Sequence, residues 1–121
     1  MAFNPRKVLV VEDEALVAML VEDALLDAGF DVMGPAATVA EAMALLEAEA
    51  PDAVVLDLNL AGETSTPVAD VLARRGIPYV IATGYGASGL PQGHRDAIVL
   101  AKPYDPAELT AMLSRICRQA A

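Results

Sequence analysis

The stretch Lys7-Val-Leu-Val-Val-Glu-Asp-Glu14 places a run of β-branched and aliphatic residues directly before three acids. A continuous apolar run of this kind is typical of a strand that is buried on both faces. The following residues, from about 14 to 28, have apolar side chains at intervals of three and four, and Gly29 comes directly after them. This spacing predicts a helix, because residues three and four apart share a helical face and glycine favours the C′ position.

The same alternation of strand and helix continues along the chain. Short apolar runs predict further strands at residues 30–33, 53–56, 79–82 and 97–101. Capping residues predict the starts of further helices at Thr38, Thr66 and Asp105, with Pro67 at the first helical position of one of them. Thr38 and Asp105 are each followed by glutamate three positions later, which is the pattern of a capping box.

Five strands that alternate with helices predict an α/β fold, with a parallel sheet covered by helices on both faces. We expect one domain over residues 1–121, since no repeat or linker interrupts the pattern. Residues 84–95 lie where the fourth helix belongs, but glycine and proline are frequent there. We therefore expect this helix to be short, poorly ordered or replaced by a loop.

The composition narrows the classes of function. The 121 residues carry 17 acidic and 8 basic side chains, for a formal net charge of −9, which disfavours a protein that binds nucleic acid through the phosphate backbone. Acids occur too early for a signal peptide, and the longest uncharged stretch, residues 76–93, is too rich in glycine and proline for a membrane helix. Cys117 is the lone cysteine, so an internal disulfide is excluded, and we expect it to be a packing residue. We expect a cytoplasmic protein without a nucleic-acid or membrane partner.

Polar residues follow the predicted strands at the points where the strands end. They are Glu12 and Asp13 after the first strand, Asp57 after the third, Thr83 after the fourth and Lys102 after the fifth. In an open α/β sheet, ligands bind at the carboxyl ends of the strands. Any one of these residues could be a helix cap or an ordinary strand residue. Together on one edge, they indicate a functional site.

The residue types of this cluster suit phosphoryl transfer. Crowded carboxylates repel one another unless a cation neutralises them, and Lys102 supplies only one positive charge. Oxygen ligands favour Mg²⁺, whereas zinc would require histidine or cysteine. A carboxylate can attack phosphorus to give an aspartyl phosphate, and Asp57, at the end of the central strand, is the expected nucleophile. Thr83, Lys102 and the backbone N–H of Gly84 would then hold the phosphoryl oxygens.

With Pro103 after Lys102, this set of residues resembles the receiver domains of two-component response regulators, and the resemblance covers residues 6–118. It implies a flavodoxin-like (βα)5 three-layer sandwich with strand order 2-1-3-4-5. It implies that Asp57 accepts a phosphoryl group from a sensor histidine kinase or a phosphotransfer protein. It also implies a cis peptide bond between Lys102 and Pro103, and a domain that catalyses only its own phosphorylation and dephosphorylation.

The resemblance also implies the ligands of the metal ion. Asp13, Asp57 and the backbone carbonyl of Asn59 would bind Mg²⁺ directly, and Glu12 would act through a water molecule.

A narrower resemblance lies in Pro78-Tyr-Val-Ile-Ala-Thr-Gly-Tyr85, which is similar to the P-F-x-F-A-T-G-Y stretch of the FAT GUY receivers. Those are mostly stand-alone receivers of α-proteobacteria, often linked to HWE-type or related kinases and to general stress signalling. The chain departs from most receivers at Val99, where an aromatic residue usually precedes the lysine by three positions. We therefore expect phosphorylation to order residues 84–95, with Tyr85 or Tyr104 as the packing element. The alternative is that Tyr85 only covers the sheet edge.

Two other functions remain open at this point. A Mg²⁺-dependent aspartyl phosphatase of the haloacid dehalogenase type usually has a second acid two residues after the nucleophile, where this chain has Asn59. A phosphorylation-independent interaction module with a receiver fold would need none of the five strand-end residues.

Overall fold

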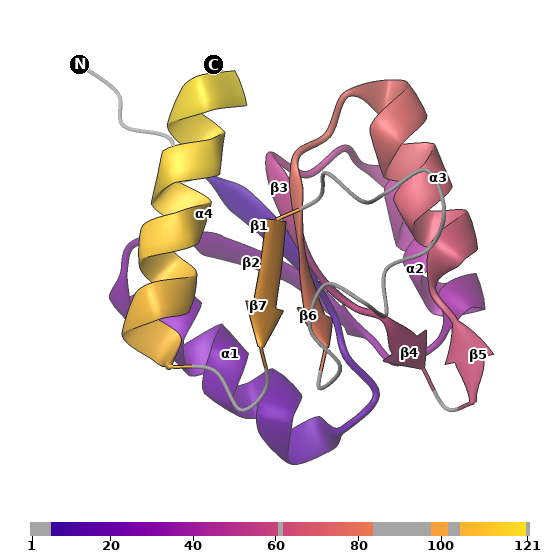
Figure 1. Ribbon diagram of the computed structural model, residues 1–121, viewed down its shortest axis with the longest axis horizontal. Helices are drawn as coiled ribbons and strands as arrows, with labels where there is room; N and C mark the ends of the chain where they lie inside the picture. The colour runs from indigo at the N-terminus through magenta and orange to yellow at the C-terminus, as the bar shows by residue number, and fades with distance from the viewer. Residues whose placement is uncertain (1–5, 61, 84–97, 102–104, 121) are drawn as a thin grey trace.

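The computed structural model describes residues 6–60, 62–83, 98–101 and 105–120. A parallel five-stranded sheet forms the middle layer, in the order β2-β1-β3-β6-β7 (Figure 1). Its strands are β1 Lys7–Val11, β2 Asp31–Ala36, β3 Ala53–Asp57, β6 Tyr79–Thr83 and β7 Ile98–Ala101. Counted along the main sheet alone, this is the order 2-1-3-4-5, so the predicted flavodoxin-like topology is confirmed.

Helices cover both faces of the sheet. They are α1 Ala15–Asp27, α2 Val39–Ala48, α3 Thr66–Arg75 and α4 Pro106–Ala120. In Figure 1, α1 and α4 lie together on one side of the sheet, and α2 and α3 lie on the other. The expected short fourth helix at residues 84–95 and the expected cis bond before Pro103 lie outside the described residues.

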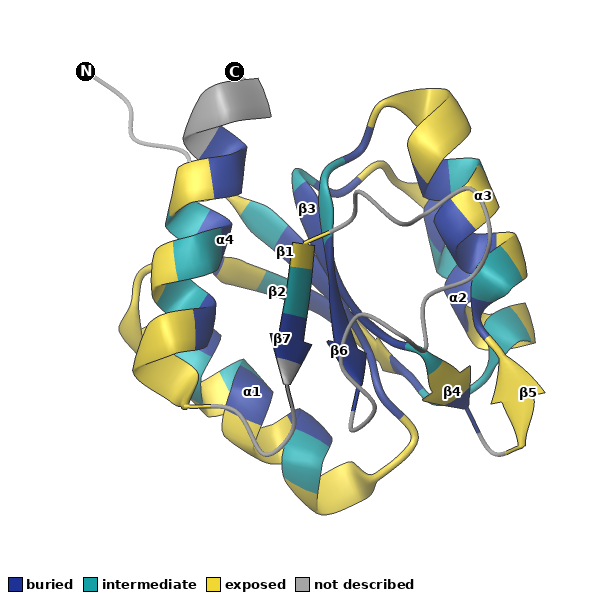
Figure 2. Cartoon of the chain, in the orientation of Figure 1, coloured by how far each residue is buried: buried dark blue, intermediate teal, exposed yellow. Residues whose placement is uncertain are grey.

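Successive residues of the central strands supply the two cores. In β1, Val8 and Val10 pack with the buried residues of α1 and α4, whereas Leu9 and Val11 pack with those of α2 and α3. Because neighbouring side chains point to opposite faces, a strand between two helical layers must be apolar at every position. Figure 2 shows β1 and β3 as buried along most of their length. Cys117, a residue of α4, is buried in the core shared by α1 and α4, as expected for a packing residue.

The end of β2 differs from the prediction, which stopped this strand at residue 33. The strand continues through Gly34 and Pro35 to Ala36, and the carbonyl of Ala36 accepts a hydrogen bond of 2.9 Å from the N–H of Glu12. Gly34 has a φ of +90°, and a Cβ at this position would lie 2.9 Å from the nitrogen of Ala36 and 3.1 Å from the carbonyl oxygen of Val10 in β1. Glycine therefore allows the two strands to stay close as they approach the carboxyl edge of the sheet.

The connection between β3 and the helix start predicted at Thr66 has secondary structure that the sequence patterns did not predict. It contains a short antiparallel pair, β4 Asn59–Leu60 and β5 Glu63–Thr64. Strands of two residues are too short to show an alternating pattern, so periodicity could not predict them.

The helix ends follow most of the predicted caps. The N–H of Phe30 donates to the carbonyl of Leu25, so α1 ends in a Schellman motif with Gly29 at C′. The hydroxyl of Thr38 accepts from the N–H of Glu41, as predicted, but the Glu41 carboxylate accepts from Ala37 and not from Thr38.

At the other two helices, the predicted cap of α4 is supported and that of α3 is wrong. The Asp105 carboxylate accepts a hydrogen bond of 2.9 Å from the N–H of Ala107 at the start of α4. Thr66 is the first residue of α3 and not its cap, and Ser65 occupies the cap position. The helix begins one residue earlier than predicted because the carbonyl of Ser65 already accepts a helical hydrogen bond of 3.1 Å from the N–H of Ala69, and Pro67 is therefore the second residue of α3 and not the first.

Candidate functional site

Three of the strand-end residues meet at the carboxyl edge of the sheet. Val11 pairs with Leu56 in the β1–β3 register, so the residues that follow them, Glu12 and Asp57, are neighbours at this edge. Thr83 ends β6, the strand on the other side of β3. All three side chains are nearly buried, with exposed fractions of 4% for Glu12, 7% for Asp57 and 3% for Thr83.

Glu12, Asp13 and Asp57 form an acidic cluster. One carboxylate oxygen from each residue lies within 4.8 Å of the corresponding oxygens of the other two. Like charges at this distance repel, and the repulsion grows where burial removes the carboxylates from water. A divalent cation relieves this repulsion, and a set of ligands made only of oxygen atoms fits Mg²⁺.

Backbone hydrogen bonds orient two of these carboxylates. The N–H of Glu14 donates to Oε2 of Glu12 over 3.1 Å, and the N–H of Asn59 donates to Oδ1 of Asp57 over 3.3 Å. Each bond comes from a residue two positions further along the chain, where the strand passes into the next segment. The turn after each strand therefore fixes the direction of the acid that ends it.

Ser65 supports the segment that carries Asn59, and sequence reasoning missed this residue. Its hydroxyl and its backbone N–H both donate to the carbonyl of Leu58, over 3.1 and 3.0 Å. The side chain is fully buried. Since Leu58 lies between Asp57 and Asn59, these two bonds hold the chain directly beside the acidic cluster. In the sequence, Ser65 stands directly before Thr66 and Pro67 at a helix start. This pattern is also that of an ordinary helix cap, so it does not by itself indicate a serine that bonds to Leu58.

The remaining predicted site residues flank the described part of the edge. Gly84 directly follows Thr83, and Lys102 directly follows Ala101, and both lie outside the described residues. Thr83 and Ala101 themselves are paired in the β6–β7 register. Val99, which replaces the aromatic residue of most receivers, is half-buried in β7 and pairs with Ile81.

The family model of the response regulator receiver domain matches residues 8–114. The chain belongs to this family. The match covers the acidic cluster, Thr83 and Lys102, so the resemblance stated from these residues is confirmed. Receiver domains are generally non-enzymatic modules of phosphorylation-dependent two-component signalling, and the family binds Mg²⁺ at an acidic cluster.

Solved receiver domains share the fold of this one. The solution structure of SdrG from Sphingomonas melonis Fr1 is 42% identical and has a TM-score of 0.80, with 93% of this chain and 96% of SdrG covered. The PhyR receiver domain from Erythrobacter litoralis is 30% identical and has a TM-score of 0.82, with 93% of this chain and 90% of that one covered.

The curated relatives are longer proteins. The transcriptional regulatory protein PdtaR from Mycobacterium tuberculosis is 33% identical to this receiver over 109 residues, which is 87% of this chain and 53% of PdtaR. The chain spans about half the length of the curated relatives it matches. Within the described residues, no helix is long and apolar enough to cross a membrane.

Proposed function

We propose that Asp57 accepts a phosphoryl group from the phosphohistidine of a sensor histidine kinase or of a phosphotransfer protein. The observation that carries this proposal is the position of Asp57, which ends the central strand with a carboxylate oxygen within 4.8 Å of those of Glu12 and Asp13. Family membership supports it, because receiver domains interact with such partners.

The reaction at Asp57 is an in-line displacement. A carboxylate oxygen forms a bond to phosphorus while the bond between phosphorus and the histidine nitrogen breaks, and the imidazole leaves with the electron pair. The hydrogen bond from Asn59 to Oδ1 fixes the plane of the carboxylate and so aims it before the donor arrives. The hydroxyl of Thr83, the ammonium of Lys102 and the N–H of Gly84 would hold the phosphoryl oxygens.

The metal ion supplies positive charge that neutralises both the acids and the phosphoryl oxygens. Asp13, which is exposed, Asp57 and the backbone carbonyl of Asn59 would be its direct ligands. Glu12 is buried and already accepts a hydrogen bond from Glu14, which suits a ligand that acts through water. An ion held by these residues would lie next to the acceptor carboxylate, where its charge would favour the arrival of an anionic phosphoryl group.

We infer that the donor is a kinase of the HWE or a related type, because of the FAT GUY-like stretch, residues 78–85, which includes β6. The same stretch supports a stand-alone, cytoplasmic receiver in general stress signalling. One solved relative, 27% identical with a TM-score of 0.78, is described as the PhyR stress response regulator. Since Val99 replaces the usual aromatic residue, we propose that phosphorylation acts by ordering residues 84–95 and not by an aromatic swing.

Intact-protein mass spectrometry tests the proposed function. The protein is incubated with acetyl phosphate, with and without Mg²⁺, beside the variants D57N and D70N. We expect one phosphoryl adduct that requires Mg²⁺, is absent from D57N and persists in D70N, which removes an exposed acid from α3. An adduct on D57N, or an adduct that forms equally well without Mg²⁺, would contradict the assignment of Asp57 as the acceptor. The absence of both an adduct and Mg²⁺ binding would favour the phosphorylation-independent module.

A further inference from the structure

Ser65 occupies the cap position of α3, but its side chain does not cap the helix. A serine at this position normally accepts a hydrogen bond from an N–H of the first helical turn, which stabilises the helix. Here the hydroxyl instead donates to the carbonyl of Leu58 over 3.1 Å, although α3 begins directly after it. The side chain is fully buried. This hydroxyl therefore acts at the end of β3, beside Asp57, and not at the helix.

The carbonyl of Leu58 and the N–H of Asn59 belong to one peptide unit. Such a unit is planar and rigid, so a group that fixes the direction of its carbonyl also fixes the direction of its N–H. The carbonyl accepts two hydrogen bonds, from the hydroxyl and from the backbone N–H of Ser65. The N–H of the same unit donates to Oδ1 of Asp57 over 3.3 Å. A single peptide unit therefore connects the Ser65 hydroxyl to the acceptor carboxylate.

Both sides of this connection rest on rigid elements. The N–H of Leu58 donates to the carbonyl of Ala82 over 3.2 Å, which ties the end of β3 to β6. The carbonyl of Ser65 accepts from the N–H groups of Val68 and Ala69, and these two residues of α3 are buried in the core. Groups held by packed elements keep their geometry better than groups on loops do. Ser65 can therefore hold the peptide unit in one orientation.

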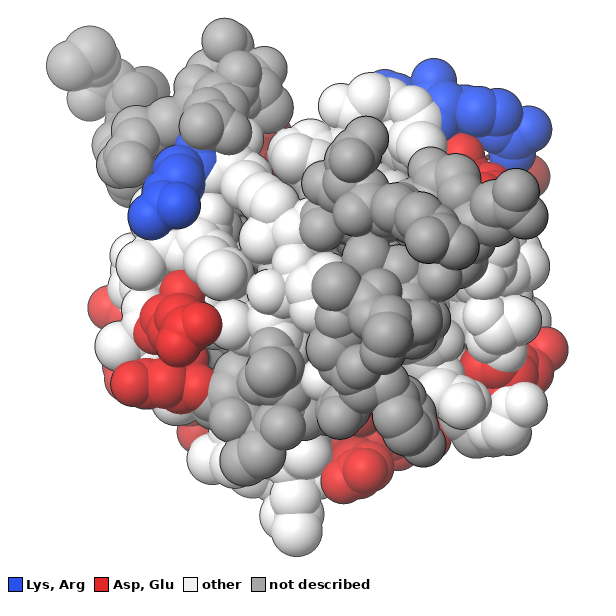
Figure 3. Space-filling view, viewed as in Figure 1, with Lys and Arg blue, Asp and Glu red and all other residues white. Residues whose placement is uncertain are grey.

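The Asp57 carboxylate needs such a support. The last torsion of an aspartate side chain has a broad energy minimum, so neighbouring donors decide where its two oxygens lie. The bond from the N–H of Asn59 is at the long end of the usual range, and a small tilt of the peptide unit would break it. Among the described residues, the basic side chains visible in Figure 3 lie at the end of the molecule opposite the carboxyl edge, so they do not orient this carboxylate.

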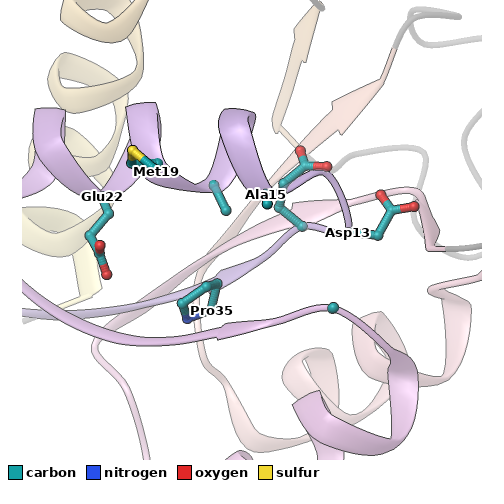
Figure 4. Close-up of a pocket in the computed structure, with 8 residues that line it drawn as sticks. Asp13, Ala15, Met19, Glu22 and Pro35 are labelled. Atoms are coloured by element: carbon teal, nitrogen blue, oxygen red, sulfur yellow. The ribbon is translucent and has the colours of Figure 1, made fainter.

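On the side of α1, the acidic cluster borders a pocket. This pocket has a volume of about 310 Å³ and lies between α1 and the end of β2, with Glu12 and Asp13 among its lining residues (Figure 4). In Figure 4, Asp13 lies at one end of the pocket and Glu22 at the other. Packing around the cluster is therefore incomplete on this side, which increases the importance of supports from the connection between β3 and α3.

We propose that Ser65 is a positioning residue for phosphoryl transfer to Asp57. Its hydroxyl fixes the carbonyl of Leu58 and, through the same peptide unit, the N–H of Asn59. That N–H holds the Asp57 carboxylate in the orientation for in-line attack on phosphorus. Because Ser65 is fully buried, it acts through the peptide unit and not by contact with the donor. The inference rests on the proposed function and adds a supporting residue to it.

Rates of adduct formation test this role. Intact-protein mass spectrometry follows the wild type, S65A, S65C and G29A with acetyl phosphate and with phosphoramidate, at saturating Mg²⁺ and at a temperature where each protein is folded. With acetyl phosphate, acetate leaves with the electron pair as the carboxylate oxygen of Asp57 bonds to phosphorus. S65A should slow the reaction about three- to tenfold, as expected for the loss of one hydrogen bond. The factor should be the same for both donors, because the orientation belongs to the acceptor.

Two variants separate positioning from stability. S65C should be slowed as S65A is, because a thiol fills the buried space but is a weak donor. G29A is the matched control. It places alanine at a φ of +90° between α1 and β2, at the amino edge of the sheet, and so destabilises the fold without a clash, since a Cβ there meets nothing within 4 Å. Its rate should stay within about twofold of the wild-type rate.

NMR gives a readout that does not depend on phosphorylation. In S65A, the amide proton of Asn59 should shift upfield and exchange faster with solvent, whereas G29A should keep the wild-type signal. The inference is overturned if this signal is unchanged in S65A, if S65A or S65C reacts at the wild-type rate, if the two donors are slowed by different factors, or if G29A is slowed as much as S65A. A wild-type protein that forms no adduct would overturn the proposed function, and this inference with it, whatever the amide signal shows.

Discussion

Replacing Asp57 with asparagine should stabilise the metal-free protein. The substitution removes one of three clustered negative charges, and the asparagine oxygen can still accept the hydrogen bond from Asn59. At a separation of 4.8 Å, Coulomb repulsion is about 0.9 kcal/mol per pair in water and about 3.5 kcal/mol at an effective dielectric constant of 20. Asp57 faces one buried and one exposed carboxylate. After partial screening, we expect a net gain of about 1–2 kcal/mol, or a rise in melting temperature of about 3–8 °C.

Mg²⁺ should make the wild type more stable than D57N. At a concentration one hundred times its dissociation constant, a bound ion stabilises the folded state by about 2.7 kcal/mol. The wild type gains this stabilisation and D57N largely loses it, and the gain exceeds the advantage that D57N has in EDTA. Thermal unfolding of both proteins and of E47Q, with EDTA and with Mg²⁺, measures the effect. E47Q makes the same change in net charge on α2 and should show the wild-type response to Mg²⁺. A D57N protein that melts below the wild type in EDTA, or that keeps the full Mg²⁺ response, would refute the argument.

Three further predictions concern Ser65, Gly34 and Cys117. S65A should lower the free energy of unfolding by about 1–2 kcal/mol in urea titration, because the buried Ser65 hydroxyl is lost and the carbonyl of Leu58 loses one of its two donors. An unchanged midpoint would count against this role for Ser65. G34A should lower the free energy of unfolding more than G29A does in the same urea titration. Both glycines have a φ of +90°, but only at Gly34 would a Cβ meet backbone within 3 Å. Equal losses in the two variants would contradict this prediction. Burial raises the pKa of the Cys117 thiol, so native protein should react with iodoacetamide far more slowly than unfolded protein does at the same pH. The thiol's contribution to stability is complete below its ordinary pKa and is lost as the pH rises through the higher folded value, which urea titrations across the alkaline range would detect.

The central strands of the main sheet could be predicted from sequence because they are buried on both faces. Val8–Val11 in β1 and Ala53–Leu56 in β3 are buried and apolar at every position, so each strand appears as an uninterrupted run with a sharp end. The shorter elements lack such a signal. The β4–β5 pair depends on contacts between residues that show no alternation, and the extension of β2 depends on a close approach at Gly34 that only the neighbouring strand explains.

For the site, the grouping of the residues could be predicted from sequence, but their burial and their supporting contacts could not. Strand ends in a parallel sheet meet at one edge, so Glu12, Asp57 and Thr83 could be grouped before their positions were known. The sequence does not show that Glu12 is buried and Asp13 exposed. The two acids are adjacent, and which of them is buried depends on how the backbone turns after β1. The role of Ser65 was equally hidden, because its partner Leu58 lies seven residues away across the β4–β5 pair.

Reductive trapping of the phosphorylated protein tests the central claim most directly. Borohydride converts an aspartyl phosphate to homoserine, and peptide mass spectrometry then locates the converted residue. The account predicts homoserine at position 57 alone, formed only after incubation with a phosphodonor and Mg²⁺. Homoserine at position 13, at another aspartate, or nowhere in protein that carries the phosphoryl adduct would show that Asp57 is not the acceptor.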